Sequence, residues 1–452
     1  MVATVTARRV VTGQPESRCS PAISKAPGLG LIHIVICNHA AAQHQHFIPA
    51  RHDAPAPTYT PRAIVCYHYP LGFFVMLEFR TQGFNGYSVK YSPFFDSRIA
   101  VATSANFGLV GNGRLYILGL TANGIVAEKW CVGTLSTQLL FQHLSHANIP
   151  NLRFDTQDSL FDSTWSESHE NQLLTACGDG SVKLFDINVP TYPIASWQEH
   201  AREVFAVHWN LVAKDTFLSS SWDGCIKIWN PNSDASITTL PTHSCTYSAS
   251  FSPHNASVLS SVSSDSHLRV FDLRTPASAS NHLTMNVPIH QPPKARMGQA
   301  ASIGIAPAEA LTHDWNKYRD TIVATAGVDR VIRTFDIRMP QAGPVAVLPG
   351  HEYAVRKLSW SPHLSDILLS ASYDMTCRVW TDGSAMGVGS VKQENMLEDP
   401  MFYGGGREMG RMGRHTEFVT GVDWCLFGAE GWCASTGWDE RVLVWDARAV
   451  MQ

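Results

Sequence analysis

The sequence predicts an all-β protein that folds as a seven-bladed β-propeller, and three observations carry this prediction. At six places in the 452 residues, an Asp stands six residues before a Trp or Phe at the end of a short apolar run. Consecutive Asp residues of this set lie 44, 42, 64, 45 and 65 residues apart, which is the spacing of a repeat architecture. Short apolar and polar runs alternate within each repeat, as antiparallel strands require. The pairs are Asp179/Phe185, Asp223/Trp229, Asp265/Phe271, Asp329/Phe335, Asp374/Trp380 and Asp439/Trp445.

One repeat contains four strand-like runs. The third run follows Trp222-Asp223-Gly224, where Asp and Gly tolerate the positive φ of a tight hairpin turn. Four antiparallel strands in each period are the blade of a β-propeller. The strands of this repeat are expected over residues 204–209, 216–221, 225–229 and 236–240.

A His, a Ser, an Asp and a Trp recur together in three repeats. A His and an Asp buried between strands need hydrogen-bond partners, which the Ser hydroxyl and the Trp N–H provide. A Ser, His and Asp could instead form a hydrolase triad, but three copies in repeated strands favour a structural role. The sequence therefore predicts no enzyme. The sets are His200/Ser219/Asp223/Trp229, His351/Ser370/Asp374/Trp380 and His415/Ser435/Asp439/Trp445.

The first blade lies upstream of the six landmarks, with Asn112 in the Asp place and Leu118 in the aromatic place. The text GLVGNG (108–113), which contains Asn112, could suggest a phosphate loop, but the Lys-Ser/Thr of such a loop is missing, so a hairpin turn is expected. Only seven residues follow Trp445, too few for a fourth strand in the last blade. We expect the apolar run near residues 75–81 to complete that blade and close the ring.

Two regions are predicted: an N-terminal extension over 1–75 and the propeller over 76–452, with insertions at 275–308 and 381–414. The extension holds Pro, His and Ala without any period, so we expect it to be disordered or an addition of the gene model, with Met76 a sensible start. Its His cluster has no Cys or acidic partner at metal-ligand spacing. The apolar run 29–37 could mimic a signal peptide, which free Cys in the propeller argues against.

Composition narrows the function classes. The net charge is −4 and no basic stripe is present, which disfavours a nucleic-acid partner. Ten Cys without a CxxC pair indicate reduced thiols in a cytoplasmic protein. We expect no cofactor, no metal and no transmembrane segment.

The text FNGYSVKYSPFFDSRIAVATSANFGLVGNGRL over residues 84–115 is the most specific in the chain. It resembles the first blade of the WD-repeat receptors for the type 2 peroxisomal targeting signal, the peroxin-7 family, of the fungal type. The resemblance covers residues 76–452, and its departures are the extension and the Gly/Met-rich insertion at 381–414. Supporting matches are FDSTWSE (161–167), QEHAREVFAVHWN (198–210) and HTEFVTGVDW (415–424).

The resemblance implies an import receptor that binds the N-terminal targeting signal of peroxisomal matrix enzymes such as thiolase. It implies a peroxin co-receptor, docking peroxins and cycling between the cytoplasm and the peroxisomal membrane and matrix. The signal is a nonapeptide that begins with a basic residue and an aliphatic one, and ends with a His or Gln and a Leu or Ala. As a helix it presents one basic and apolar face. The alternative is a general WD-repeat scaffold, such as a ubiquitin-ligase substrate adaptor or a chromatin-associated propeller.

A helix of that kind needs carboxylates beside aromatic rings. Both are predicted on one rim of the ring, where the loops before each first strand meet the turns that carry the Asp. Carboxylates there would pair with an Arg, and the rings would cover apolar side chains. Asp162 is a weaker candidate, because its register allows it to point into the blade. The candidates are Asp158, Glu203, Trp222, Glu309, Tyr373, Glu417 and Trp438.

Overall fold

The computed structural model divides the chain into residues 1–60 and residues 61–452. It describes residues 67–69, 72–74, 76–105, 112–121, 124–128, 152–189, 192–291, 307–385, 405–427 and 430–451. The predicted extension, with its His cluster and the apolar run 29–37, lies outside the described residues up to residue 66. A short antiparallel hairpin of β1 (Tyr67–Tyr69) and β2 (Gly72–Phe74) follows, which the sequence did not predict.

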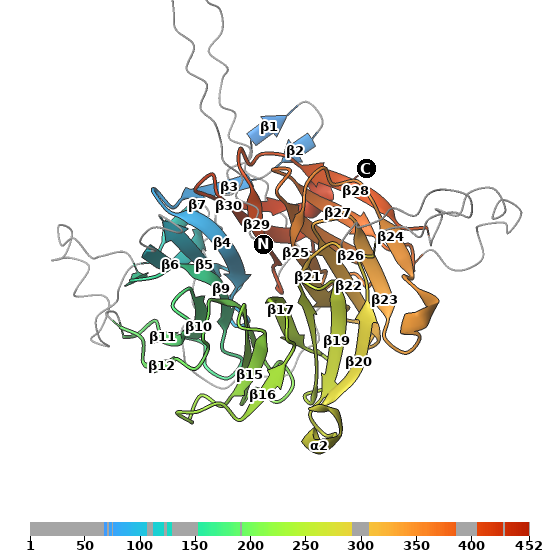
Figure 1. Cartoon of the computed structure of the whole chain (residues 1–452). Helices are drawn as coiled ribbons and strands as arrows, with labels where there is room; N and C mark the ends of the chain where they lie inside the picture. Colours follow the sequence, from blue (N-terminus) through green and yellow to red (C-terminus); the bar gives the residue numbers. More distant parts are fainter. Residues whose placement is uncertain are drawn as a thin grey trace, which may run out of the picture. The chain divides into compact units, whose positions relative to one another are not determined.

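Seven antiparallel sheets are arranged as the blades of a β-propeller, so the predicted fold class is confirmed (Figure 1). Among the described residues, no helix is long and apolar enough to cross a membrane. Blade one contains β4 (Asn85–Tyr91), β5 (Arg98–Ala105), β6 (Asn112–Thr121), β7 (Gly124–Ala127) and β8 (Arg153–Thr156). Blade two contains β9 (Leu160–Trp165), β10 (Gln172–Cys177), β11 (Val182–Asp186) and β12 (Ala195–Trp197). Blade three contains β13 (Val204–Trp209), β14 (Phe217–Ser221), β15 (Cys225–Trp229) and β16 (Thr238–Pro241).

The remaining four blades follow in chain order, and the last one takes its outer strand from the N-terminal part. Blade four contains β17 (Thr246–Phe251), β18 (Val258–Ser263), β19 (His267–Asp272), helix α2 (Ala277–Ser280) and β20 (Leu283–Pro288). Blade five contains β21 (Ala310–Trp315), β22 (Ile322–Gly327), β23 (Ile332–Asp336), the 3-10 turn η1 (Pro340–Ala342) and β24 (Ala346–Leu348). Blade six contains β25 (Val355–Trp360), β26 (Ile367–Ser372), β27 (Cys377–Thr381) and β28 (Arg407–Met412). Blade seven contains β29 (Val419–Trp424), β30 (Trp432–Gly437), β31 (Arg441–Asp446), the 3-10 turn η3 (Ala447–Ala449) and β3 (Met76–Arg80).

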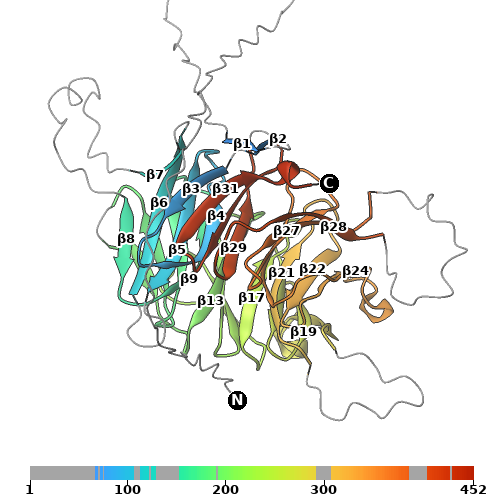
Figure 2. The ribbon, with the colours of Figure 1, turned by 90° about the horizontal axis from the view of Figure 1, so that it is seen from above.

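The closing strand is confirmed. β3 pairs antiparallel with β31, with Met76 opposite Trp445 and Arg80 opposite Arg441 (Figure 2). A backbone bridge between Gly410 and Met451 also joins the end of the chain to β28 of blade six. The ring is thus closed by strands from both ends of the described chain.

The two predicted insertions are narrower than expected. β20 lies inside residues 275–308 and is the outer strand of blade four, and β28 lies inside 381–414 and is the outer strand of blade six. An outer strand pairs on one side only, and much of each of these two is exposed, so neither needs the apolar alternation that marks an inner strand. The polar and Gly/Met-rich sequences of β20 and β28 therefore lack the pattern of a strand, and both strands fall within the predicted insertions.

The landmark Asp residues stand in tight turns between the second and third strands of six blades. The residue after each Asp has a positive φ, between 59° and 83°. Gly fills this place after Asp179 and Asp223, whereas Ser266, Arg330, Met375 and Glu440 fill it in the other four turns. The turn is therefore imposed by the blade and not by glycine alone.

Candidate functional site

The three His/Ser/Asp/Trp sets form chains of hydrogen bonds between strands. In blade three, His200 Nδ1 donates to Asp223 at 2.8 Å, and Ser219 Oγ lies 2.8 Å from His200 Nε2. Trp229 Nε1 donates to the same hydroxyl at 2.8 Å. The equivalent contacts measure 2.7–2.8 Å in blade six and 2.9–3.3 Å in blade seven.

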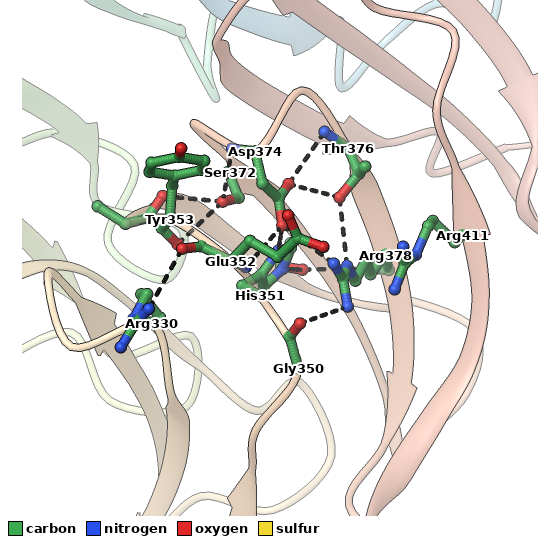
Figure 3. A network of polar contacts seen from close by, with 12 residues as sticks. Arg330, Gly350, His351, Glu352, Tyr353, Ser372, Asp374, Thr376, Arg378 and Arg411 are labelled. Carbon is green, nitrogen blue, oxygen red and sulfur yellow. Dashed lines mark hydrogen bonds and ion pairs between the residues drawn. The ribbon is translucent and has the colours of Figure 1, made fainter.

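Asp374 is the best-satisfied member of these sets (Figure 3). Burial would raise the pKa of its carboxyl, but the bonds from His351 and Thr376 hold that pKa well below its ordinary value. Arg378 then joins Asp374 at 3.0 Å to Glu408 at 2.8 Å. The Asp of blade six is therefore held as a carboxylate by donors from the loop before β25, from its own turn and from β27.

The set in blade seven departs from the other two at Ser435. Its hydroxyl lies 2.9 Å from His415 Nε2, but Trp445 Nε1 donates to it at 3.3 Å instead of 2.8 Å. All the predicted contacts of this set are present, and the bond from Trp445 to Ser435 is the longest and weakest of them. Ser219, Ser370 and Ser435 are all fully buried. These residues therefore stabilise the blades and present no nucleophile at the surface.

A fourth set was missed by the sequence reasoning. His290 Nδ1 donates to Asp329 at 2.9 Å, and its Nε2 lies 3.1 Å from Thr325 Oγ1. Phe335 takes the Trp place and supplies no donor. His290 stands in the predicted insertion, 39 residues before its Asp instead of 23 or 24, so the spacing concealed it.

All seven candidate binding residues lie at one edge of the ring, which we call the Asp-turn rim. Asp158, Glu203, Glu309 and Glu417 come within two residues of the start of a first strand, β9, β13, β21 or β29. Trp222, Tyr373 and Trp438 directly follow the second strands β14, β26 and β30. In an antiparallel blade the first strand begins where the second ends, so these positions share a rim.

Every first strand has a register shift at its second or third residue. One residue is left out of the ladder there, and a bulge of this kind re-aims its side chain. Four of the seven bulged residues are aromatic. The sequence does not reveal them, because a bulge depends on how the first strand pairs with the second strand of its blade. The bulged residues are Tyr87, Phe161, Phe205, Tyr247, Leu311, Arg356 and Thr420.

Three predicted aromatics meet five others in a continuous series at this rim. We call the series the aromatic arc; neighbouring rings lie 4.4 to 6.0 Å apart between centroids. The indole N–H groups of Trp222 and Trp438 are hidden from solvent and have no partner in the described part of the chain. In order, the arc contains Tyr373, Phe418, Trp438, Tyr87, Phe161, Phe205, Trp222 and Tyr247, from blades six, seven, one, two, three and four.

The four predicted acids differ in how they are engaged. Glu309 is exposed and accepts a hydrogen bond from the Tyr247 hydroxyl at 3.0 Å, so it touches the arc. Glu203 lies 3.5 Å from Arg202 Nε, and Glu417 is exposed. Asp158 accepts the backbone N–H of Ser159 at 2.7 Å, which commits one of its oxygens to the loop.

Asp162 points into the central channel, beneath the rim. Its carboxylate accepts from Ser88 Oγ at 2.6 Å and lies 3.4 Å from Lys357 Nζ. Burial would raise the pKa of Asp162, but Lys357 and Lys90 lower it. This pair lines a cavity of about 170 Å³ whose wall mixes polar side chains, including His208, with apolar ones. Asp162 therefore braces blade two against blade six and is not a rim residue.

Comparison with known proteins agrees with this geometry. The family model "WD domain, G-beta repeat" matches residues 191–230, 235–272 and 342–381. The "Peroxisomal targeting signal 2 receptor" of Saccharomyces cerevisiae is 40% identical over 417 residues, 82% of this chain and 99% of the yeast protein. "Peroxisome biogenesis protein 7" of Arabidopsis thaliana is 40% identical over 80% of this chain and 95% of its own length. The human "Peroxisomal targeting signal 2 receptor" is 32% identical over 76% and 87%. The chain belongs to the family of peroxisomal targeting signal 2 receptors.

Proposed function

We propose that this chain is a receptor that binds the type 2 targeting signal of peroxisomal enzymes as a helix laid on the aromatic arc. The observation that carries the proposal is the arc itself, a continuous series of eight rings at the rim where carboxylates also gather. Its Trp222, Tyr373 and Trp438 are partly exposed and accessible to a ligand. The protein acts by binding and not by catalysis.

The chemistry of the rim fits the signal. The apolar face of the helix packs on the rings, which contribute large contact areas with few rotatable bonds. Glu309, Glu203 and Glu417 are available for the basic residue that begins the signal, since carboxylates pair bidentately with Arg. Asp158 contributes less, because the loop already uses one of its oxygens.

The partners and the route belong to the proposal as well. The cargo includes thiolase, and a peroxin co-receptor and docking peroxins bind the loaded receptor. The protein cycles between the cytoplasm and the peroxisome. The similarity to peroxisomal targeting signal 2 receptors supports binding of the signal.

The test is a titration of the full chain with a fluorescent type 2 signal peptide, with and without a candidate co-receptor. A peptide of the same composition in scrambled order, which has no continuous apolar and basic face, is the control. We expect saturable binding of the signal peptide only. Equal binding of both peptides, or of neither in both conditions, would instead favour a general WD-repeat scaffold.

A further inference from the structure

Arg356 reaches across the mouth of the central channel, by which we mean the end of the channel at the Asp-turn rim. It is the bulged residue of β25 in blade six, and its guanidinium lies 5.7 Å from the ring centroid of Phe205 in blade three. Blades six and three face each other across the ring, so the side chain spans the mouth. The hydroxyls of Tyr87 and Tyr247 are near enough to feel its charge, which lowers their pKa values against the larger, raising effect of burial.

This guanidinium has no acceptor of its own in the described part of the chain. Only 9% of Arg356 is exposed, yet neither a carboxylate nor a hydrogen-bond acceptor is within reach among those residues. Other buried arginines are paired: Arg378 with Asp374 and Glu408, and Arg269 with Asp265. Arg356 is not among the described residues whose buried nitrogens lack a partner, so solvent reaches its guanidinium. A ligand that covers the mouth would take this charge out of water and would have to supply its acceptors.

We propose that Arg356 receives the C-terminal end of the bound signal helix and thereby fixes the direction in which the helix lies. The last four carbonyls of a helix have no partner within the helix, and they form the negative end of its dipole. The planar guanidinium offers five N–H donors to such acceptors, or to a carboxylate one turn further on. This inference rests on the proposed function.

The opposite end of the helix then meets the opposite charge. Glu309 and Glu203 lie at the Asp-turn rim on blades five and three, which flank the blade of Tyr247. A basic residue at the start of the signal is placed beside these carboxylates when the C-terminal end is over Arg356. The reversed helix would put its positive end on Arg356 and its negative end on the carboxylates, so charge alone selects one direction.

The test compares two fluorescent peptides that share the signal and differ one turn after its last residue, where one carries Glu and the other Lys. At low salt, the wild-type chain should bind the Glu peptide about tenfold more tightly, since a hydrogen bond between charged groups is among the stronger ones. Arg356→Gln should abolish this preference, and Arg356→Glu should reverse it. The comparison on the wild-type chain needs no variant, so it decides even if a variant fails to fold.

Arg330→Gln is the matched control, because Arg330 is an exposed arginine of the same rim and its removal changes the net charge equally. It should keep the preference for the Glu peptide. Binding of both peptides with equal affinity by the wild type, or an unchanged preference in a folded Arg356→Gln, would overturn the role of Arg356 alone. Binding of neither peptide would overturn the proposed function with it.

Discussion

The ring of Phe205 stacks on the indole of Trp222 with centroids 4.4 Å apart and planes within 10° of each other. Phe205 is re-aimed by the bulge of β13, and Trp222 follows the end of β14, so the stack joins two independent features of one blade. A flat aromatic pair of this kind is fixed in place before any ligand arrives, which reduces the entropy that binding must overcome.

Trp222→Ala should weaken binding of the signal peptide by about 2 kcal/mol, roughly thirtyfold in Kd, because aromatic anchors dominate interface energies. Fluorescence anisotropy measures the change, and a thermal melt verifies that the variant is folded. Tyr192→Ala, at an exposed aromatic of the opposite rim, should leave the affinity as it is. A folded Trp222→Ala with wild-type affinity would remove the indole from the binding surface.

Charge reversal at the rim should weaken binding in a graded way. Glu309→Lys and Glu203→Lys should cost roughly 2–5 kcal/mol if a basic residue of the signal becomes partly buried against these carboxylates. Glu417→Lys should cost less: Glu309 is also exposed but bonds to Tyr247 of the aromatic arc, and a pair of exposed charges away from the rings is worth only about 0–1 kcal/mol. Titrations at two salt concentrations measure both effects.

Asp320→Lys, which reverses an exposed charge on the opposite rim, is the control for the net charge of the protein. Equal losses in this control and in Glu309→Lys would mean that long-range attraction, and not a local pair, guides the peptide.

Ser370→Ala should destabilise the propeller without touching the rim. The hydroxyl serves both His351 Nε2 and Trp380 Nε1, so its loss leaves buried groups unpaired at a cost of about 1–3 kcal/mol. Urea denaturation measures the free energy of unfolding, and Ser280→Ala at an exposed site should change it little. A stability equal to wild type would show that the network contributes nothing net to folding.

Acid should destabilise the protein through its buried imidazoles. Burial lowers the pKa of His313 to about 4, whereas an unfolded His has a pKa of about 6.5. The unfolded chain therefore binds a proton that the folded chain refuses, and stability falls as the pH drops through this window. His313 alone should account for about 1–2 kcal/mol between pH 7 and pH 5.

Urea midpoints at the two pH values measure this dependence, and His313→Gln should reduce its slope. His169→Gln, at an exposed histidine, should leave the slope unchanged. A slope that survives in a folded His313→Gln would assign the pH dependence to other groups.

Removal of the closing strand should unfold or aggregate the chain. A protein that begins at Met76 keeps β3 and should remain folded, whereas one that begins at Thr81 leaves the edge of β31 unpaired. Size-exclusion chromatography and circular dichroism distinguish the two results. A monomeric, folded protein without β3 would show that blade seven is stable with three strands.

Sequence reasoning succeeded where the signal is local. The Asp and the aromatic six residues later lie in one hairpin, and Trp445 so near the end of the chain required a strand from elsewhere. Sequence reasoning failed where the direction of a side chain depends on pairing between strands. Tyr87 and Arg356 reach the channel mouth through bulges, and the residues of one repeat do not indicate a bulge. His290 and β28 were missed because long loops shift their spacing and outer strands tolerate polar text.

The closing pair also sets an order of events during synthesis. Met76 and its partner Trp445 are separated by 369 residues, so at about 5–20 residues per second β3 leaves the ribosome roughly 20–70 s before its partner exists. Throughout that time the strand is an open edge on a growing chain. Newly made protein is thus most vulnerable to mispairing before its last blade is translated, and the supply of active receptor depends on what shields β3 in that interval.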